Sequence, residues 1–164
     1  MATPASDRLD TALGVLVALP VGLIVVLTFA DVFARYLFAA PIRGSLEIIE
    51  FAMALTIFAA LPLVTRARGH VTVSLVDGAL PRAWRPLHRA LCDTIGAAAL
   101  ALLSWRLAAQ ALDDVQAGTQ TIVLQLPKAP LAFAMSALAA LSALLMLLLA
   151  WRTWQRPHPA AGAR

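Results

Sequence analysis

Four long apolar runs constrain this chain more than any other feature of its sequence. A transmembrane helix needs roughly 20 mostly apolar residues, and four segments meet that length: about residues 13–38, 46–64, 87–112 and 131–151. Only 13% of the residues are charged and the mean hydropathy is +0.81, whereas a soluble surface needs roughly 25% charged residues. We therefore expect an all-α integral membrane protein with four transmembrane helices, in which residues 1–164 form a single membrane domain.

The first apolar run follows a short polar stretch that contains Arg8, so a cleaved secretory signal peptide is an alternative interpretation. Its uncharged part, residues 13–30, is longer than the roughly 7–15 residues of a signal h-region, and three comparable runs follow it. We therefore expect a retained span. The polar residues 155–164 at the other end are expected to form a disordered tail.

The basic residues indicate how the spans are oriented. Four spans place both termini on one side of the membrane, and the positive-inside rule assigns the side richer in Lys and Arg to the cytoplasm. Nine of the 13 basic residues fall on the side of the termini, namely Arg8, Arg66, Arg68, Arg82, Arg85, Arg89, Arg152, Arg156 and Arg164. The opposite side carries Arg35, Arg43 and Lys128 beside the acidic pair Asp113–Asp114. Both termini are therefore expected to be cytoplasmic.

Two connections between the spans are long enough to have structure of their own. In the connection after the second span, Val71, Leu75 and Val76 have near-helical spacing beside polar residues, which predicts a short interfacial amphipathic helix. The connection before the fourth span contains the apolar stretch Ile122–Leu126, which is too short to cross a membrane and is followed by Pro127. We expect that stretch to rest on the outer surface.

Several charged residues fall at one predicted depth near the outer side. A helix rise of about 1.5 Å per residue places Asp31, Glu50 and Arg106 at about 27, 24 and 25 Å from the inner edge of the membrane. The charge cluster thus comprises Asp31, Arg35, Glu47, Glu50, Arg106 and Gln110. Because an isolated ionised group costs several kcal/mol in lipid, these side chains should face one another or a protein partner.

Three interpretations of the charge cluster remain open. It is a static clasp that joins three helices, a contact with a partner subunit, or a solute site. A transport site is expected nearer the membrane midplane, often at broken helices, which disfavours the last interpretation.

The sequence lacks the residues that haem binding, a disulfide, a cysteine-based metal site or catalysis would need. His70, His88 and His158 lie in a predicted loop or tail, so none is placed to ligate a haem iron within the membrane. Cys92 is the one cysteine, so an internal disulfide and a cysteine-based metal site are both excluded. The sequence has no catalytic triad, paired catalytic carboxylates or phosphate loop. For these reasons we expect no cofactor and no enzymatic activity. The basic residues are scattered between apolar runs rather than gathered in a patch, so we also expect no nucleic-acid partner.

Four stretches of the sequence, taken in order, resemble a known family. They are DVFARYLF, SLEIIEFAM, TRARGHVTVSLVDGALP and VLQLPKAPLAFAM. Together they are similar to the small permease subunit of tripartite ATP-independent periplasmic (TRAP) transporters, the DctQ-like family, over about residues 9–154. The motif positions are Asp31, Arg35, Tyr36, Glu47, Gly69, His70, Asp77, Pro81 and Pro127. The resemblance implies structural or assembly roles for them, whereas Arg43 and Arg106 are singled out by charge and depth alone.

This resemblance implies a multi-pass subunit of the bacterial inner membrane. In that family the small subunit pairs with a large, DctM-like permease and a periplasmic solute-binding protein, and the large subunit carries the sodium and substrate sites. The small subunit supports the scaffold of the large one during uptake of a carboxylate-type solute. The chain ends soon after the fourth span, so we expect no fusion to a large subunit. The alternative is a self-sufficient small oligomeric transporter or channel that uses the charge cluster.

Overall fold

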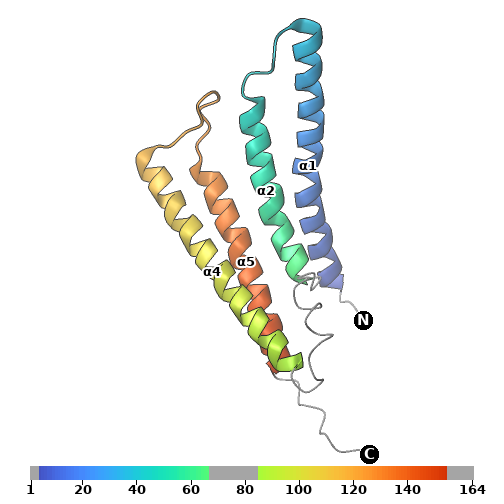
Figure 1. The fold of residues 1–164 in the computed structure, drawn as a ribbon, viewed down its shortest axis with the longest axis vertical. Coiled ribbons are helices and arrows are strands. Elements are labelled where there is room, and N and C mark those ends of the chain that lie inside the picture. Colours follow the sequence, from blue (N-terminus) through green and yellow to red (C-terminus); the bar gives the residue numbers. More distant parts are fainter. Residues whose placement is uncertain (1–3, 67–84, 155–164) are drawn as a thin grey trace, which may run out of the picture.

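The computed structural model describes residues 4–66 and 85–154, and four long helices make up most of this part of the chain (Figure 1). They are α1 (Pro4–Phe38), α2 (Ser45–Arg66), α4 (Arg85–Ala117) and α5 (Ala129–Trp154). Each contains a segment long and apolar enough to cross a membrane: Thr11–Phe38, Ser45–Thr65, Ala90–Ala117 and Ala129–Trp151. The expectation of a helical protein with four candidate spans is confirmed. The predicted interfacial helix and the tail at residues 155–164 lie outside the described residues.

Two helices extend well beyond the predicted apolar runs. Helix α1 begins at Pro4 rather than near residue 13, and α4 continues to Ala117 rather than ending near residue 112. The added turns of α4 carry Asp113 and Asp114. A helix can continue into polar residues where its side chains are hydrated, so the apolar run alone does not mark its end. Gly118 directly follows α4, and its φ of +60° is the left-handed conformation common just after a helix.

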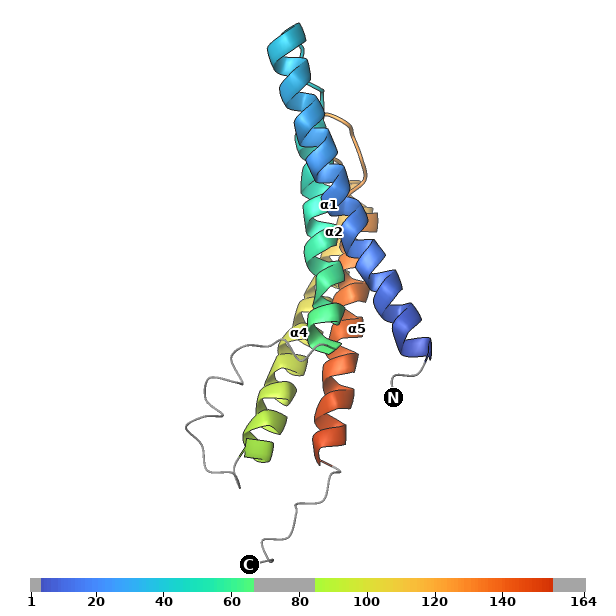
Figure 2. The same cartoon turned by 90° about the vertical axis from the view of Figure 1, so that its right-hand side faces the viewer.

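The four helices form a row rather than a closed bundle. Helix α2 packs against α1 and α5, and α5 packs against α4, whereas α4 makes no contact with α1 or α2. Figure 1 shows this order across the row, and Figure 2 views it from the edge, with α1 crossing α2. Within the apolar stretch of each helix, the buried share is 11% in α1 and α4 but 22% in α2 and 33% in α5. The row is therefore one helix thick, and even its inner helices keep much of their surface open.

Small residues bring α4 and α5 close together. Their buried side chains include Ala97, Ala111, Ala132, Ala139 and Ala143. Met146 packs over Gly96, where an added Cβ would lie 2.5 Å from the Met146 Cε atom. Because lipid is as apolar as the side chains, helices in a membrane associate through such close packing and through hydrogen bonds. These contacts form the tightest part of the row.

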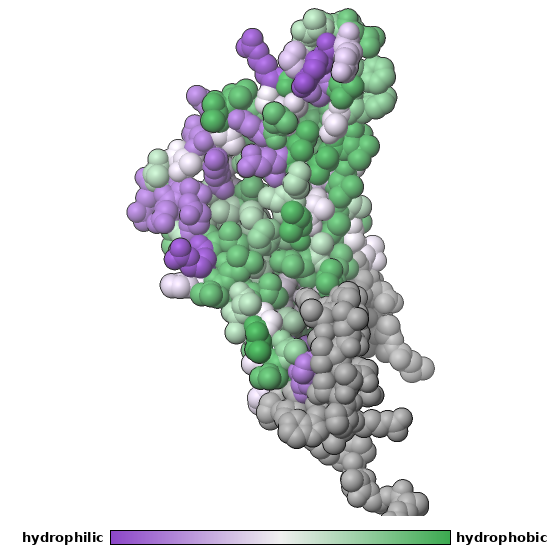
Figure 3. Space-filling model, in the orientation of Figure 1, coloured by the Kyte–Doolittle hydropathy of each residue, from purple (hydrophilic) through white to green (hydrophobic). Residues whose placement is uncertain are grey.

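The loops 39–44 and 118–128 lie at one end of the row, here called the loop end, and the described ends of α1 and α5 nearest the termini lie at the other (Figure 1). On the face shown in Figure 3, hydrophilic residues gather near the loop end, while apolar residues cover much of the helices below it. The residues predicted to form the charge cluster belong to this half of the structure.

Candidate functional site

The Asp31 carboxylate joins the end of α1 to the start of α2. Its Oδ2 atom accepts a hydrogen bond from the Arg35 guanidinium at 2.8 Å. Its Oδ1 atom accepts one from the Ile42 backbone N–H at 2.9 Å and one from the Ser45 hydroxyl at 3.2 Å. Asp31 is only 8% exposed. A buried carboxylate is stable when several donors satisfy its oxygens, and here the donors come from the helix, the loop and the next helix.

The backbone between α1 and α2 turns through left-handed residues at both of its ends. Ala39 follows α1 with a φ of +50°, and the Ala40 N–H donates to the Ala34 carbonyl six residues earlier. This is the bond of a Schellman motif, which satisfies a carbonyl left free at a helix end. Gly44 then adopts a φ of +79°, and its carbonyl accepts the Ile48 N–H as α2 begins. The turn brings Ile42 and Ser45 back to Asp31.

The Glu47 carboxylate joins the first turn of α2 to the loop between α4 and α5. Its Oε1 atom accepts the Val123 N–H at 2.7 Å and its Oε2 atom accepts the Leu124 N–H at 2.9 Å. An ionised carboxylate has acceptors only, so its two oxygens suit two adjacent backbone donors. This contact ties α2 to a loop 76 residues away in sequence.

The segment that Glu47 holds is a hairpin-like turn, here called the hairpin loop (residues 119–128). Gln120 and Pro127 form an antiparallel bridge across it, and the Thr121 N–H donates to the Leu126 carbonyl at 2.9 Å. The Leu126 N–H in turn donates to the Thr121 hydroxyl at 3.0 Å. Ile122 at its tip is 94% exposed. The predicted family position Pro127 therefore lies at the base of a folded loop.

Leu124 packs directly over Gly44 at the same end of the row. A Cβ atom added to Gly44 would overlap Leu124 Cγ and would lie 2.7 and 2.8 Å from its two Cδ atoms. Both the positive φ and the lack of space therefore require glycine at position 44. The Glu47 hydrogen bonds and the Gly44–Leu124 packing together fix the hairpin loop on the start of α2.

The predicted charge cluster is only partly assembled within the chain. Asp31 and Arg35 form the ion pair that their spacing predicts. The side chains of Glu50 and Arg106 are both exposed, and neither side chain has a hydrogen bond or an ion pair within residues 4–66 and 85–154. The clasp interpretation would join Arg106 to Glu50 or Asp31, but the structure does not bring these side chains together, because α5 lies between α4 and α2. Gln110 donates to Asp114 on its own helix at 3.2 Å and does not bind the acids of α1 or α2.

Apart from Arg35, the partners that the structure gives Asp31 and Glu47 were not expected from the sequence. Most are backbone N–H groups of loops, and a hydropathy pattern does not show where such groups point. The sequence offered one signal, the Gly44–Ser45 pair, because glycine and serine often mark the start of a helix. Arg43 is exposed and Tyr36 is 82% exposed near the end of α1. The family positions Gly69, His70, Asp77 and Pro81 lie outside the described residues.

A broad apolar groove lies on the described helices, and these helices hold no cluster suited to a metal ion. The groove has a volume of about 500 Å³ and is lined by apolar side chains of α1, α2 and α5, among them Pro20, Phe51 and Leu131. Within residues 4–66 and 85–154, no three His, Cys, Asp or Glu side chains come together as metal ligands. The lining of the groove therefore suits apolar rather than polar contacts.

Four apolar helices of membrane-spanning length define a multi-pass helical membrane protein. A family model described as "Tripartite ATP-independent periplasmic transporters, DctQ component" matches residues 24–156. The chain therefore belongs to the DctQ family, the small membrane component of TRAP transporters, and the resemblance noted in the sequence is confirmed. This is a family of transporter components that work with a large permease and a periplasmic binding protein. Searches of curated proteins and of solved structures find no match.

Proposed function

We propose that this chain is the scaffold subunit of a sodium-coupled TRAP transporter. In this role it supports a large, DctM-like permease during uptake of a carboxylate-type solute that a periplasmic solute-binding protein delivers. The observation that carries the proposal is the one-layer row, in which α2 and α5 bury only 22% and 33% of their apolar stretches. Helices with so much open apolar surface suit lateral packing against a larger membrane protein, and the family supplies the identity of that protein.

Four hydroxyl groups within the spans also support a scaffold role. Ser104 and Ser136 hydrogen-bond to each other across α4 and α5, and Thr56 and Ser142 hydrogen-bond to carbonyls of their own helices. These groups are satisfied within the protein, so they are not presented to a solute. The described groove is lined by apolar side chains, whereas a transport site needs convergent polar groups near the midplane.

The proposed location is the bacterial inner membrane, with both termini in the cytoplasm, as the nine basic residues on the terminal side suggest. Single cysteines at Arg68, Arg85 and Arg156, in a variant that lacks Cys92, should resist a membrane-impermeant thiol reagent in intact cells. A cysteine at Gln116 should react. Reaction at the first three positions and protection at Gln116 would reverse the orientation.

Reconstituted vesicles test the transport role directly. Vesicles that hold this chain together with the large permease should take up a carboxylate when supplied with the binding protein and a sodium gradient. Vesicles that hold this chain alone should show no uptake, and replacing sodium with potassium should abolish uptake in the complete system. Sodium-driven uptake by the chain alone would instead favour the self-sufficient small transporter.

A further inference from the structure

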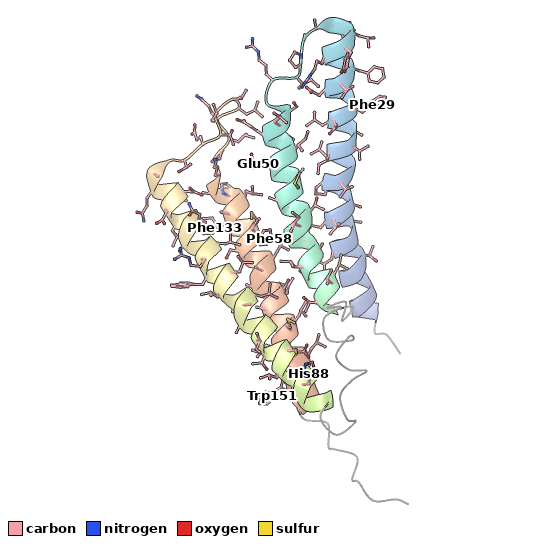
Figure 4. All side chains as sticks on the ribbon, in the orientation of Figure 1. Phe29, Glu50, Phe58, His88, Phe133 and Trp151 are labelled. Atoms are coloured by element: carbon pink, nitrogen blue, oxygen red, sulfur yellow. The ribbon has the colours of Figure 1, made fainter. Side chains whose placement is uncertain are left out.

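Glu50 interrupts an apolar stripe on the surface of α2. Leu46, Glu50, Met53 and Ile57 follow one another at spacings of three or four residues, so they lie on one side of the helix. The three apolar residues are 77%, 51% and 55% exposed. Figure 4 labels Glu50 in the part of α2 nearest the loop end. It lies five residues into the candidate span Ser45–Thr65, which corresponds to about 7.5 Å along the helix. An acidic side chain therefore sits among apolar side chains that face away from the row.

Two other acids near this end of the row, Asp31 and Glu47, show what Glu50 lacks. Asp31 accepts three hydrogen bonds and Glu47 accepts two, all from this chain. Glu50 has no such donor within residues 4–66 and 85–154, although it lies less than one helical turn beyond Glu47. Because an ionised carboxylate in lipid costs several kcal/mol, a charge at this position calls for a donor beyond the described part of the chain.

Lipid itself satisfies Arg106 far better than it satisfies Glu50. Arg106 is the other exposed member of the predicted charge cluster without a partner in the described part of the chain. An arginine side chain is long, and its guanidinium can reach lipid phosphates at the membrane surface. A glutamate side chain is short, and lipid phosphates carry a charge of the same sign. Arg106 therefore finds its counter-charge in lipid phosphate, whereas a cationic side chain of a protein is the better match for Glu50.

We propose that Glu50 binds a lysine or arginine side chain of the large permease, and that the stripe of Leu46, Met53 and Ile57 packs around this ion pair. The inference rests on the proposed function, because that function supplies the permease. Apolar neighbours exclude water from a charged contact at the centre of an interface, which is the arrangement in which one residue contributes most to binding. The contact of Glu47 with the hairpin loop fixes the rotation of α2, which keeps Glu50, three residues further on, exposed.

Co-purification of the complex in mild detergent tests the ion pair. The Glu50→Gln variant should lower the recovery of the large permease with this chain about tenfold, and Glu50→Lys should lower it further through repulsion. Glu50→Asp keeps the charge and should retain more permease than Glu50→Gln. Changing permease Lys or Arg residues to Glu one at a time should identify a position that restores recovery with Glu50→Lys.

Arg106→Gln is the matched control, since it also replaces an exposed charged side chain with an amide but lies on α4, which does not contact α2, and it should keep recovery within about twofold of the wild type. The isolated Glu50→Gln chain should melt at the wild-type temperature, which separates a lost partner from a lost fold.

Wild-type recovery of the permease by both Glu50→Gln and Glu50→Lys overturns the inference and leaves the proposed function standing. A change in the oligomeric state of the isolated Glu50→Gln chain also overturns it, because it assigns Glu50 to a contact between copies of this chain. Failure of the wild-type chain to retain the permease instead refutes the proposed function.

Discussion

Ser104 of α4 and Ser136 of α5 exchange a reciprocal pair of hydrogen bonds, in which each hydroxyl donates to the backbone carbonyl of the other residue at 2.9 Å. The two hydroxyl oxygens lie 3.4 Å apart. Such a pair forms only where small side chains let two backbones approach closely. It therefore marks the point at which the α4–α5 pair is held by polar contacts as well as by packing.

Removing either hydroxyl should weaken the α4–α5 pair. We expect Ser104→Ala and Ser136→Ala each to lower the free energy of unfolding in detergent by about 0.5–1.5 kcal/mol. The control is Ser142→Ala, because the fully buried Ser142 hydroxyl donates at 2.9 Å to Leu138 of its own helix. Thermal unfolding measures all three variants. An equal loss in Ser142→Ala would show that hydroxyl burial, rather than the bond between helices, is responsible.

Gly44→Ala should destabilise the loop end more than Gly118→Ala. Both glycines have positive φ, so an alanine costs about 1–2 kcal/mol at either position. Only at Gly44 does the added methyl group meet another side chain, that of Leu124. Overpacking should add about 1–3 kcal/mol there. Chemical unfolding of the two variants provides the comparison, and Leu124→Ala should recover part of the loss in Gly44→Ala but none in Gly118→Ala.

Replacing Glu47 should release the hairpin loop from α2. Glu47→Gln turns one acceptor oxygen into an amide donor that faces the backbone N–H of Val123 or Leu124. We expect amide hydrogen exchange at residues 120–126 to become about tenfold faster, as measured by mass spectrometry. Glu50→Gln is the matched control, because Glu50 has no hydrogen bond in the described part of the chain. Unchanged exchange in Glu47→Gln would contradict the role given to this carboxylate.

Asp31→Asn should cost more stability than Arg35→Gln, although the two residues form one ion pair. The Arg35 side chain is 60% exposed and that of Asp31 only 12%, so water can replace the lost partner of Arg35 but not that of Asp31. The asparagine amide would also face the Arg35 guanidinium, which donates only. We expect about 1–3 kcal/mol for Asp31→Asn and below about 1 kcal/mol for Arg35→Gln. Equal losses in thermal unfolding would show that the ion pair itself is the stabilising contact.

Glu50→Gln and Arg106→Gln should have additive effects on the stability of the isolated chain. The two residues belong to helices that do not touch, so a double-mutant cycle should give a coupling below about 0.5 kcal/mol. Urea unfolding of the two single variants and the double variant measures this coupling. A larger coupling would restore the clasp between these helices that the charge pattern suggested.

The sequence by itself determined that this chain forms membrane-spanning helices. Lipid offers no hydrogen bonds to the backbone, so each apolar run of about 20 residues must satisfy its own backbone groups as a helix. The apolar runs do not mark where the helices end, because a helix can continue into polar residues, as α4 does at Asp113 and Asp114. The spacing of Asp31 and Arg35 likewise predicts their ion pair, because residues four apart share one face of a helix.

Only the tertiary structure decided which charged residues meet. The rise of a helix converts a residue number into a depth, and on that basis Asp31, Glu50 and Arg106 belonged together. Depth does not say which helices are neighbours, and α5 lies between the helix of Arg106 and those of the two acids. The partners of Asp31 and Glu47 are instead mainly backbone N–H groups at Ile42, Val123 and Leu124. Every residue except proline carries such a group, so no side-chain pattern distinguishes these three, and only the folded path of the loops aims them at a carboxylate.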